Sequence, residues 1–176
     1  KPSVYGGKPF QIDVGLAWGG DIADEGSFEE LRYANKVPLL YKKSSCVTTK
    51  AIEEVDWSRY NISQSGSRPQ GPLYISIHIA SVWVPFTSEG KEAVANYDDI
   101  RKEMKLALQE AGRKLGRYIK RQERKEIQEE KKRKLTSYAT EMGDAIAELA
   151  GDGDSEEYET EIKRMVQKDY DPEGLK

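Results

Sequence analysis

The chain has 176 residues, of which 37% are apolar and 34% charged, with a formal net charge of -3. This length fits one globular domain plus an extension, and the excess of charge requires long solvated surfaces. No stretch approaches the roughly 18 apolar residues of a membrane-spanning helix, and no secretory leader opens the chain, so we expect a soluble intracellular protein. One cysteine and one histidine exclude an internal disulfide, a cysteine-based zinc site and a multi-histidine metal cage, so we expect no metal site. Because the sequence starts at a lysine, we also expect it to be a piece of a longer protein.

The first elements show the two-residue period of β-strands. Residues 10–18 alternate apolar and polar side chains, which predicts a strand with one buried face. An acidic loop that includes Glu29 and Glu30 should lead to a second strand over residues 31–41, interrupted near Pro38.

A helix, a loop and a third strand follow. Residues 46–55 carry apolar side chains at helical spacing, which predicts a short amphipathic helix. Residues 61–72 are rich in Ser, Gly, Gln and Pro and should form a mobile loop, whereas residues 73–79 alternate again as a buried strand. From Asp98 the pattern is helical for nearly forty residues, and its apolar stripe should pack on the sheet as far as Ile119. Beyond that point the helix should continue as a charged stalk.

Two further helices are predicted, over residues 138–150 and 156–168, on either side of a linker at 151–154. The predicted fold class is therefore α+β, with a β-β-α-β sheet backed by helices and a long C-terminal stalk helix. The expected parts are a sheet and loop part (1–96), a long helix or stalk (97–136) and an acidic tail, helical or disordered (137–176).

Charge is strongly segregated along the chain. Residues 113–134 contain eleven Lys/Arg and four Glu, hence +7, whereas residues 141–176 contain twelve Asp/Glu and four Lys/Arg, hence -8. The basic run, with Arg117, Lys120 and Arg121, could bind nucleic acid phosphates. The alternative, that these charges form the solvated face of a long helix, has equal weight.

The loop at residues 84–95, between a buried strand and the long helix, can carry a site. Ser88, Gly90 and Lys91 are residue types that contact phosphate: a hydroxyl, a glycine that permits close approach, and a compact ammonium group. Their spacing does not match the phosphate loop of nucleotide-binding proteins. From the pattern alone, a solvated loop lysine is the default interpretation of Lys91.

Several segments carry a specific signal when they are taken jointly and in order. They are LRYANKVPLLY at 31–41, TKAI at 49–52, WSRY at 57–60, HIAS at 78–81, VPF at 84–86 and GKEA at 90–93. In these segments the chain resembles the transducer domain of the DNA topoisomerase VI B subunit, which belongs to a type IIB topoisomerase with a GHKL-type ATPase. The resemblance covers about the first 120 residues and leaves the acidic remainder unmatched.

The resemblance implies a role for Lys91 as the switch lysine of the ATPase. It would project into the nucleotide pocket of a neighbouring domain and contact the γ-phosphate of ATP, with Ser88 and Gly90 beside it. ATP and Mg²⁺ would be bound mainly by an upstream domain, outside this sequence. The fragment alone should therefore hydrolyse nothing.

The resemblance also implies partners. They are a topoisomerase A subunit that cleaves DNA and is reached through the long helix, a second B subunit that pairs through the ATPase domain, and double-stranded DNA. By the same resemblance, the segment with Trp57, Arg59 and Tyr60 faces DNA. Trp57 could equally cap the core, and both interpretations stay open.

A non-enzymatic alternative exists for the whole chain. It could be a nucleic-acid or partner-binding adaptor related to these B subunits, such as a meiotic relative that has lost ATP turnover. The compartment would be the cytoplasm in an archaeon and the nucleus in a eukaryote.

Of the remaining residues, His78 should be a structural hydrogen-bonding group, and Asp98 and Asp99 should complement the dipole at a helix start. Cys46 has no evident redox or nucleophilic partner in the sequence.

Overall fold

A computed structural model describes residues 2–22, 26, 28–151 and 154–170 of the chain. The chain divides into two compact units, Lys1–Ile119 and Lys120–Lys176. Within the described residues, no helix is both long enough and apolar enough to cross a bilayer.

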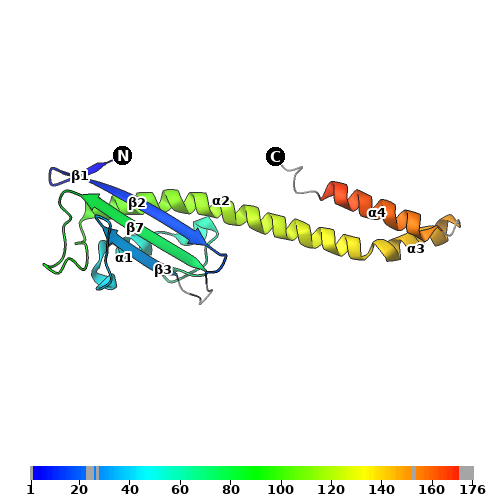
Figure 1. Cartoon of the computed structure of the whole chain (residues 1–176), viewed down its shortest axis with the longest axis horizontal. Coiled ribbons are helices and arrows are strands. Elements are labelled where there is room, and N and C mark those ends of the chain that lie inside the picture. Colours follow the sequence, from blue (N-terminus) through cyan, green and yellow to red (C-terminus); the bar gives the residue numbers. More distant parts are fainter. Residues whose placement is uncertain (1, 23–25, 27, 152–153, 171–176) are drawn as a thin grey trace. The chain divides into compact units, whose positions relative to one another are not determined.

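The first unit is built on a five-stranded sheet (Figure 1). The β3–β7 pair is parallel and the other strand pairs are antiparallel. The predicted alternation is confirmed, because the side chains of Ile75, Ile77 and Ile79 are fully buried and the residues between them are half-exposed. The strand order is β1 (Ser3–Tyr5), β2 (Lys8–Trp18), β7 (Leu73–Ser81), β3 (Glu29–Ala34) and β4 (Val37–Pro38).

The second predicted strand is two strands, β3 and β4, joined by a tight turn. Asn35 and Lys36 form the turn with positive φ angles of 47° and 69°, so the strand breaks before Pro38 rather than at it. The prediction of an acidic loop over Glu29 and Glu30 was wrong. Both residues belong to β3, and Glu30 is buried where hydroxyl groups of the following helix donate hydrogen bonds to its carboxylate.

One face of the sheet is covered by α1 (Val47–Glu53) and the first half of α2 (Asp98–Ser137). The apolar stripe of α2 packs as predicted, with Ile100, Met104 and Leu108 fully buried in the core that the sheet forms. Ile119 is the last buried residue of α2, so the stripe ends where the sequence predicted.

Short elements connect these layers. The 3-10 helix η1 (Lys43–Ser45) leads into α1, and η2 (Trp57–Tyr60) follows it. The predicted loop over residues 61–72 contains a small hairpin of β5 (Gln64–Ser65) and β6 (Arg68–Pro69).

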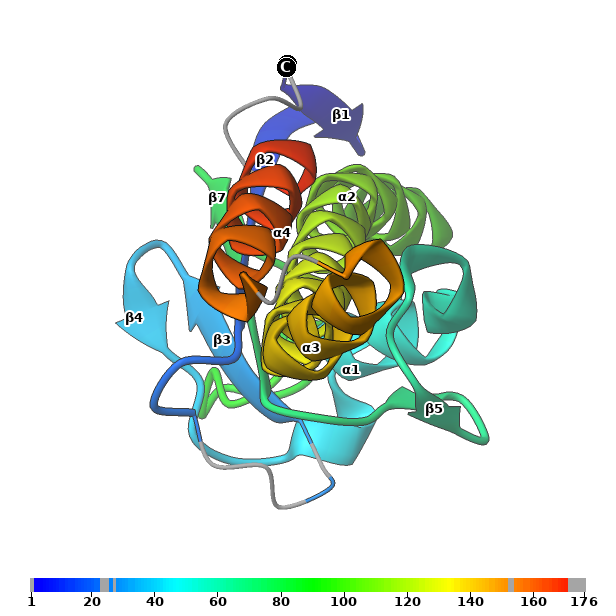
Figure 2. The same cartoon turned by 90° about the vertical axis from the view of Figure 1, so that its right-hand side faces the viewer.

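In the second unit, α3 (Ala139–Ala150) and α4 (Ser155–Asp169) pack side by side (Figures 1 and 2). The contact is close at Gly143, where an added Cβ would lie 2.9 Å from the carbonyl oxygen of Ser155. The predicted acidic tail is thus helical over α3 and α4. Positions 152–153 of the predicted linker and 171–176 of the tail lie outside the described residues.

Candidate functional site

The loop between β7 and α2 has a stem that is fixed to the core. Phe86 and Val94 form an antiparallel bridge, and the Thr87 N–H donates to the Ala93 carbonyl at 2.9 Å. The Val94 backbone is also bonded to the start of α1, because its carbonyl accepts from the Val47 N–H at 3.1 Å. These contacts hold the stem in one place relative to α1 and the sheet.

Lys91 lies at the tip of this loop. Its N–H donates to the Ser88 carbonyl at 3.1 Å, which closes a turn, and its φ angle of 52° lies in the left-handed region. Residues other than glycine, asparagine and aspartate are uncommon in that region, so the surrounding contacts must hold Lys91 there. Ser88, Gly90 and Lys91 are all exposed, and no ion pair of the Lys91 ammonium occurs among the described residues.

Gly90 is not required by the turn geometry. Its φ angle is not in the left-handed region, and an added Cβ would meet only the flexible side chain of Glu92, at 3.5 Å. Glu92 itself forms an ion pair with Lys42, at 2.6 Å between its carboxylate and the ammonium nitrogen. This partner of the loop was not predicted, because the two residues are fifty positions apart and no pattern in the sequence pairs them.

The loop presents one exposed cation, Lys91, at its tip. No three or more His, Cys, Asp or Glu side chains gather to form a metal site in the part of the chain that the structure describes. His78 has a structural position, as predicted. Its Nε2 accepts from the Lys36 N–H at 3.2 Å, and its Nδ1 lies 3.1 Å from the Asp13 carboxylate.

The structure places Trp57 in the core. Its side chain is fully buried, and the indole N–H donates to the Ile52 carbonyl at 3.0 Å. The indole is therefore not available to stack on DNA, and the core interpretation of Trp57 replaces the DNA-facing one. The neighbouring Arg59 stays exposed and pairs with Asp56 at 2.9 Å. Hydrogen bonds from Ser58 and then Arg59 lower the pKa of the Asp56 carboxyl group.

Tyr60 fits a notch in α2 that two glycines create. An added Cβ at Gly112 would lie 2.8 Å from the Tyr60 ring, and one at Gly116 would lie 2.7 Å from the Tyr60 carbonyl oxygen. The four-residue spacing of two glycines on a predicted helix is the signal that could have revealed this close approach. As a result, η2 is held against α2.

The basic residues of α2 are exposed. Arg117, Lys120 and Arg121 lie on the surface, and none of the described residues forms an ion pair with them. By contrast, Lys114 is paired with Glu110 at 2.9 Å. Free guanidinium and ammonium groups on a helix are available to bind phosphate.

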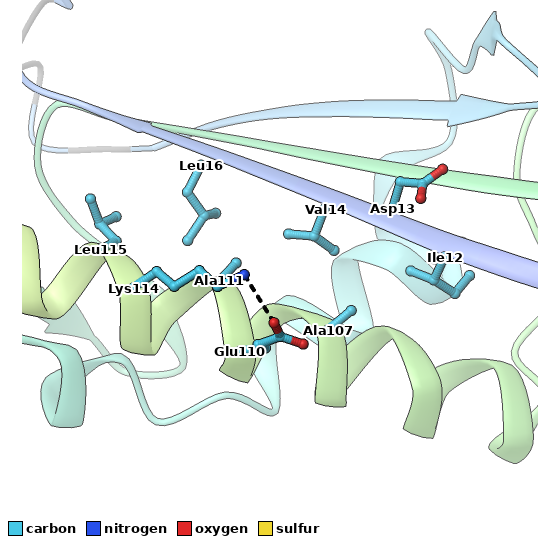
Figure 3. A pocket seen from close by; sticks show the side chains of 9 residues that line it. All are labelled: Ile12, Asp13, Val14, Leu16, Ala107, Glu110, Ala111, Lys114 and Leu115. Atoms are coloured by element: carbon cyan, nitrogen blue, oxygen red, sulfur yellow. Dashed lines mark ion pairs between the residues drawn. The ribbon is translucent and has the colours of Figure 1, made fainter. Parts of the chain in front are cut away.

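A groove of about 430 Å³ lies between β2 and α2 (Figure 3). Apolar side chains such as Val14, Leu16 and Leu115 line it, and the Glu110–Lys114 ion pair lies at its rim. The Lys114 hydrogen bond and charge lower the pKa of Glu110. The charged residues that line the groove are Asp13, Glu110 and Lys114.

Residues 1–132 match the family model described as the transducer of the topoisomerase VI B subunit. Curated relatives, each named as the B subunit of type 2 DNA topoisomerase 6, cover most of the chain. The one from Natronomonas pharaonis is 45% identical over 90% of this chain and 20% of its own length. Those from Methanosarcina acetivorans and Archaeoglobus fulgidus are 42% and 50% identical, over 85% and 70% of this chain and 24% and 21% of their own lengths.

The chain thus spans about a fifth to a quarter of the length of these relatives. The family match covers the whole sheet, the loop that bears Lys91, and most of α2. The chain therefore belongs to the transducer family of topoisomerase VI B subunits.

Proposed function

We propose that this chain is the transducer part of an ATP-dependent type IIB DNA topoisomerase. In this role it relays ATP binding and hydrolysis to the passage of double-stranded DNA, which a partner A subunit cleaves. The observation that carries the proposal is Lys91, an exposed cation at the tip of a loop whose stem is fixed to the core, with no ion pair to any residue that the structure describes.

Lys91 is the nucleotide-sensing residue in this proposal. Its ammonium group contacts the γ-phosphate in the pocket of an ATPase domain elsewhere in the longer protein, with Ser88 and Gly90 as flanking contacts. A hydrogen bond of this charged kind contributes about 1.5–3 kcal/mol and is lost after hydrolysis. A contact present in one state only shifts a two-state hinge by about tenfold to a hundredfold. ATP and Mg²⁺ are held mainly by that ATPase domain.

The partners follow from the same proposal. Two B subunits pair through their ATPase domains, and α2 leads to the A subunit in a heterotetramer of two A and two B subunits. Arg59, Arg117, Lys120 and Arg121 contact DNA phosphates, which their exposure supports. Because the relatives described above are archaeal, the parent protein would act in the cytoplasm.

The test is ATP-dependent relaxation of supercoiled DNA by the complete two-subunit enzyme. Lys91→Asn removes the ammonium group, and asparagine tolerates the left-handed backbone at this position. Lys36→Asn is the matched control, because Lys36 is also an exposed lysine with a positive φ, of 69°.

We expect Lys91→Asn to lower relaxation and ATP turnover by about tenfold or more, with assembly intact, and Lys36→Asn to leave both unchanged. Native activity of an assembled Lys91→Asn enzyme would remove Lys91 from the mechanism. The family membership would then describe the fold alone.

A further inference from the structure

We propose that Lys42 is a positioning residue for Lys91 and acts through its ion pair with Glu92. This inference rests on the proposed function, because it concerns how the phosphate-sensing lysine is held. The ion pair joins two segments that are distant in sequence, with 2.6 Å between the Lys42 ammonium nitrogen and the Glu92 carboxylate. Glu92 is the residue directly after Lys91.

Lys42 offers a fixed point of attachment. The buried Arg32 donates from Nη2 to the Tyr41 carbonyl at 3.0 Å, immediately before Lys42. The Lys42 carbonyl itself accepts from the Ser45 N–H at 3.3 Å and the Ser45 hydroxyl at 3.1 Å. The backbone on both sides of Lys42 is therefore held by hydrogen bonds, which fix the point from which its side chain reaches Glu92.

The loop tip needs this attachment. The last stem hydrogen bond joins Thr87 and Ala93, and beyond it the only backbone bond within the tip is the one from Lys91 to Ser88. All five residues between Thr87 and Ala93 belong to the described part of the chain, and Glu92 is the one with a side-chain ion pair to another segment. The ion pair thus restrains the residue next to Lys91, which would otherwise depend on one turn hydrogen bond.

Two lysines with positive φ are next to Glu92, Lys42 through the ion pair and Lys91 as its neighbour in sequence. Lys42 has a φ of 54° and Lys91 a φ of 52°, both in the left-handed region that lysine rarely adopts. Such conformations persist only where the surroundings hold them, and they occur often at ligand-binding and switch sites. The Lys42–Glu92 pair is the contact that links these two residues.

The pair also controls the charge at the tip. Glu92 carries a negative charge beside Lys91, and alone it would oppose the approach of a phosphate. Lys42 compensates that charge and leaves the Lys91 ammonium unopposed by its neighbour. Loss of Lys42 should therefore be more harmful than loss of Glu92, since only the former leaves an unpaired carboxylate next to the phosphate-sensing group.

The experiment is a double-mutant cycle in the complete two-subunit enzyme. The variants are Lys42→Asn, which suits the left-handed backbone, Glu92→Gln, which keeps the side-chain shape, and the double variant. Each is also made together with Lys91→Asn, and kcat and KM for ATP are measured. The matched control is Glu53→Gln, which breaks an exposed ion pair with Arg68 away from the loop; there the carboxylate side chain is 32% exposed, as in Glu92.

For partly exposed ion pairs we expect changes of about twofold to fivefold. Lys42→Asn should lower kcat/KM about fivefold and Glu92→Gln about twofold. The double variant should recover to the level of Glu92→Gln, because the uncompensated carboxylate is gone. None of the substitutions should have a further effect in the Lys91→Asn enzyme, because residues that act as one unit are not additive.

Two results would overturn the inference. One is a Lys42→Asn enzyme that matches the native one or the Glu53→Gln control. The other is a Lys42→Asn substitution that lowers kcat/KM by the same factor in the Lys91→Asn enzyme as in the native enzyme, since Lys42 would then act independently of Lys91. If Lys91→Asn alone leaves turnover native, the proposed function fails and the inference with it. If Lys91→Asn is impaired and Lys42→Asn is not, only the inference fails.

Discussion

Two glycines of α2 form a notch that holds Tyr60. At this notch the structure predicts that replacing a glycine lowers stability, whereas helix propensity alone predicts that it raises stability. Gly116 is in the interior of α2, where replacement of glycine by alanine normally stabilises a helix by about 1 kcal/mol. At this position, however, an added Cβ would lie 2.7 Å from the carbonyl oxygen and 3.0 Å from the Cα of Tyr60. Both are backbone atoms, so no rotation of a side chain relieves the clash.

The structure therefore predicts that Gly116→Ala destabilises the chain. Relief requires η2 to move away from α2, which disturbs the buried Trp57 beside Tyr60. Overpacking of this kind costs about 1–3 kcal/mol. Because the contact involves backbone, we take the upper part of that range and subtract the gain in propensity, which leaves a net loss of about 1–2 kcal/mol.

Urea denaturation followed by tryptophan fluorescence measures this difference. Gly90→Ala is the control for the general effect of removing a glycine, since Gly90 is exposed and its added Cβ meets only a flexible side chain at 3.5 Å. We expect the control to stay within about 0.5 kcal/mol of the native chain. A Gly116→Ala chain as stable as the native one, or more stable, would refute the packing of Tyr60 in the notch.

Three further predictions concern the core, the loss of stability at low pH, and DNA binding. Trp57→Phe should lower the free energy of unfolding by about 1–3 kcal/mol, because the indole hydrogen bond is lost and a cavity is left. The folded variant should bind DNA like the native chain in an anisotropy titration. Hydrogen bonds from Gln11 and then His78 lower the pKa of Asp13. The contribution of Asp13 to stability is therefore present above its unfolded-state pKa and lost as pH falls through its folded-state pKa. In urea denaturation at a series of pH values, Asp13→Asn should reduce the loss of stability over this acidic range. Arg117→Gln should reduce the slope of log K for DNA against log salt by about 0.9, and an unchanged slope would show that Arg117 makes no phosphate contact.

The regular elements were predictable because their signals are local. The alternation over residues 10–18 and 73–79 follows from which side chains face the core, and the structure buries the second set as predicted. The stripe of Ile100, Met104 and Leu108 in α2 is equally local. In each case the residues that define the period are also the residues that the core buries.

The errors come from contacts between distant residues. Glu30 looks like a loop residue because carboxylates are rarely buried, yet its carboxylate accepts hydrogen bonds from Thr48 at 2.9 Å and Thr49 at 2.9 Å and 3.0 Å. Nothing around Glu30 in the sequence announces these partners. The burial of Trp57 was open for another reason: its hydrogen-bond partners, the Ile52 carbonyl and Gln64, are near in sequence but follow no helical or strand period.

In the candidate site, too, the local features were predictable and the contacts between distant segments were not. Residue types placed Lys91 in a loop between a strand and a helix, which is where the structure has it. Its assignment to a γ-phosphate came from the resemblance alone, because a lysine, a serine and a glycine do not define a phosphate site by spacing. The Lys42–Glu92 pair was missed because an ion pair between distant loops leaves no periodic pattern.

The contacts around the loop also indicate how a signal at Lys91 can leave it. The stem is bonded to α1 through Val94, and the first turn of α2 is bonded to the end of α1 through the Arg101–Glu54 ion pair at 2.9 Å. These contacts connect the loop stem, α1 and the start of α2 into one block. Under the proposed function, the phosphate contact turns this whole block against the ATPase domain and does not bend the loop alone. The hinge must then lie outside this block, and a loop made more flexible, as by loss of the Glu92 contact, should transmit less of the signal even when Lys91 is present.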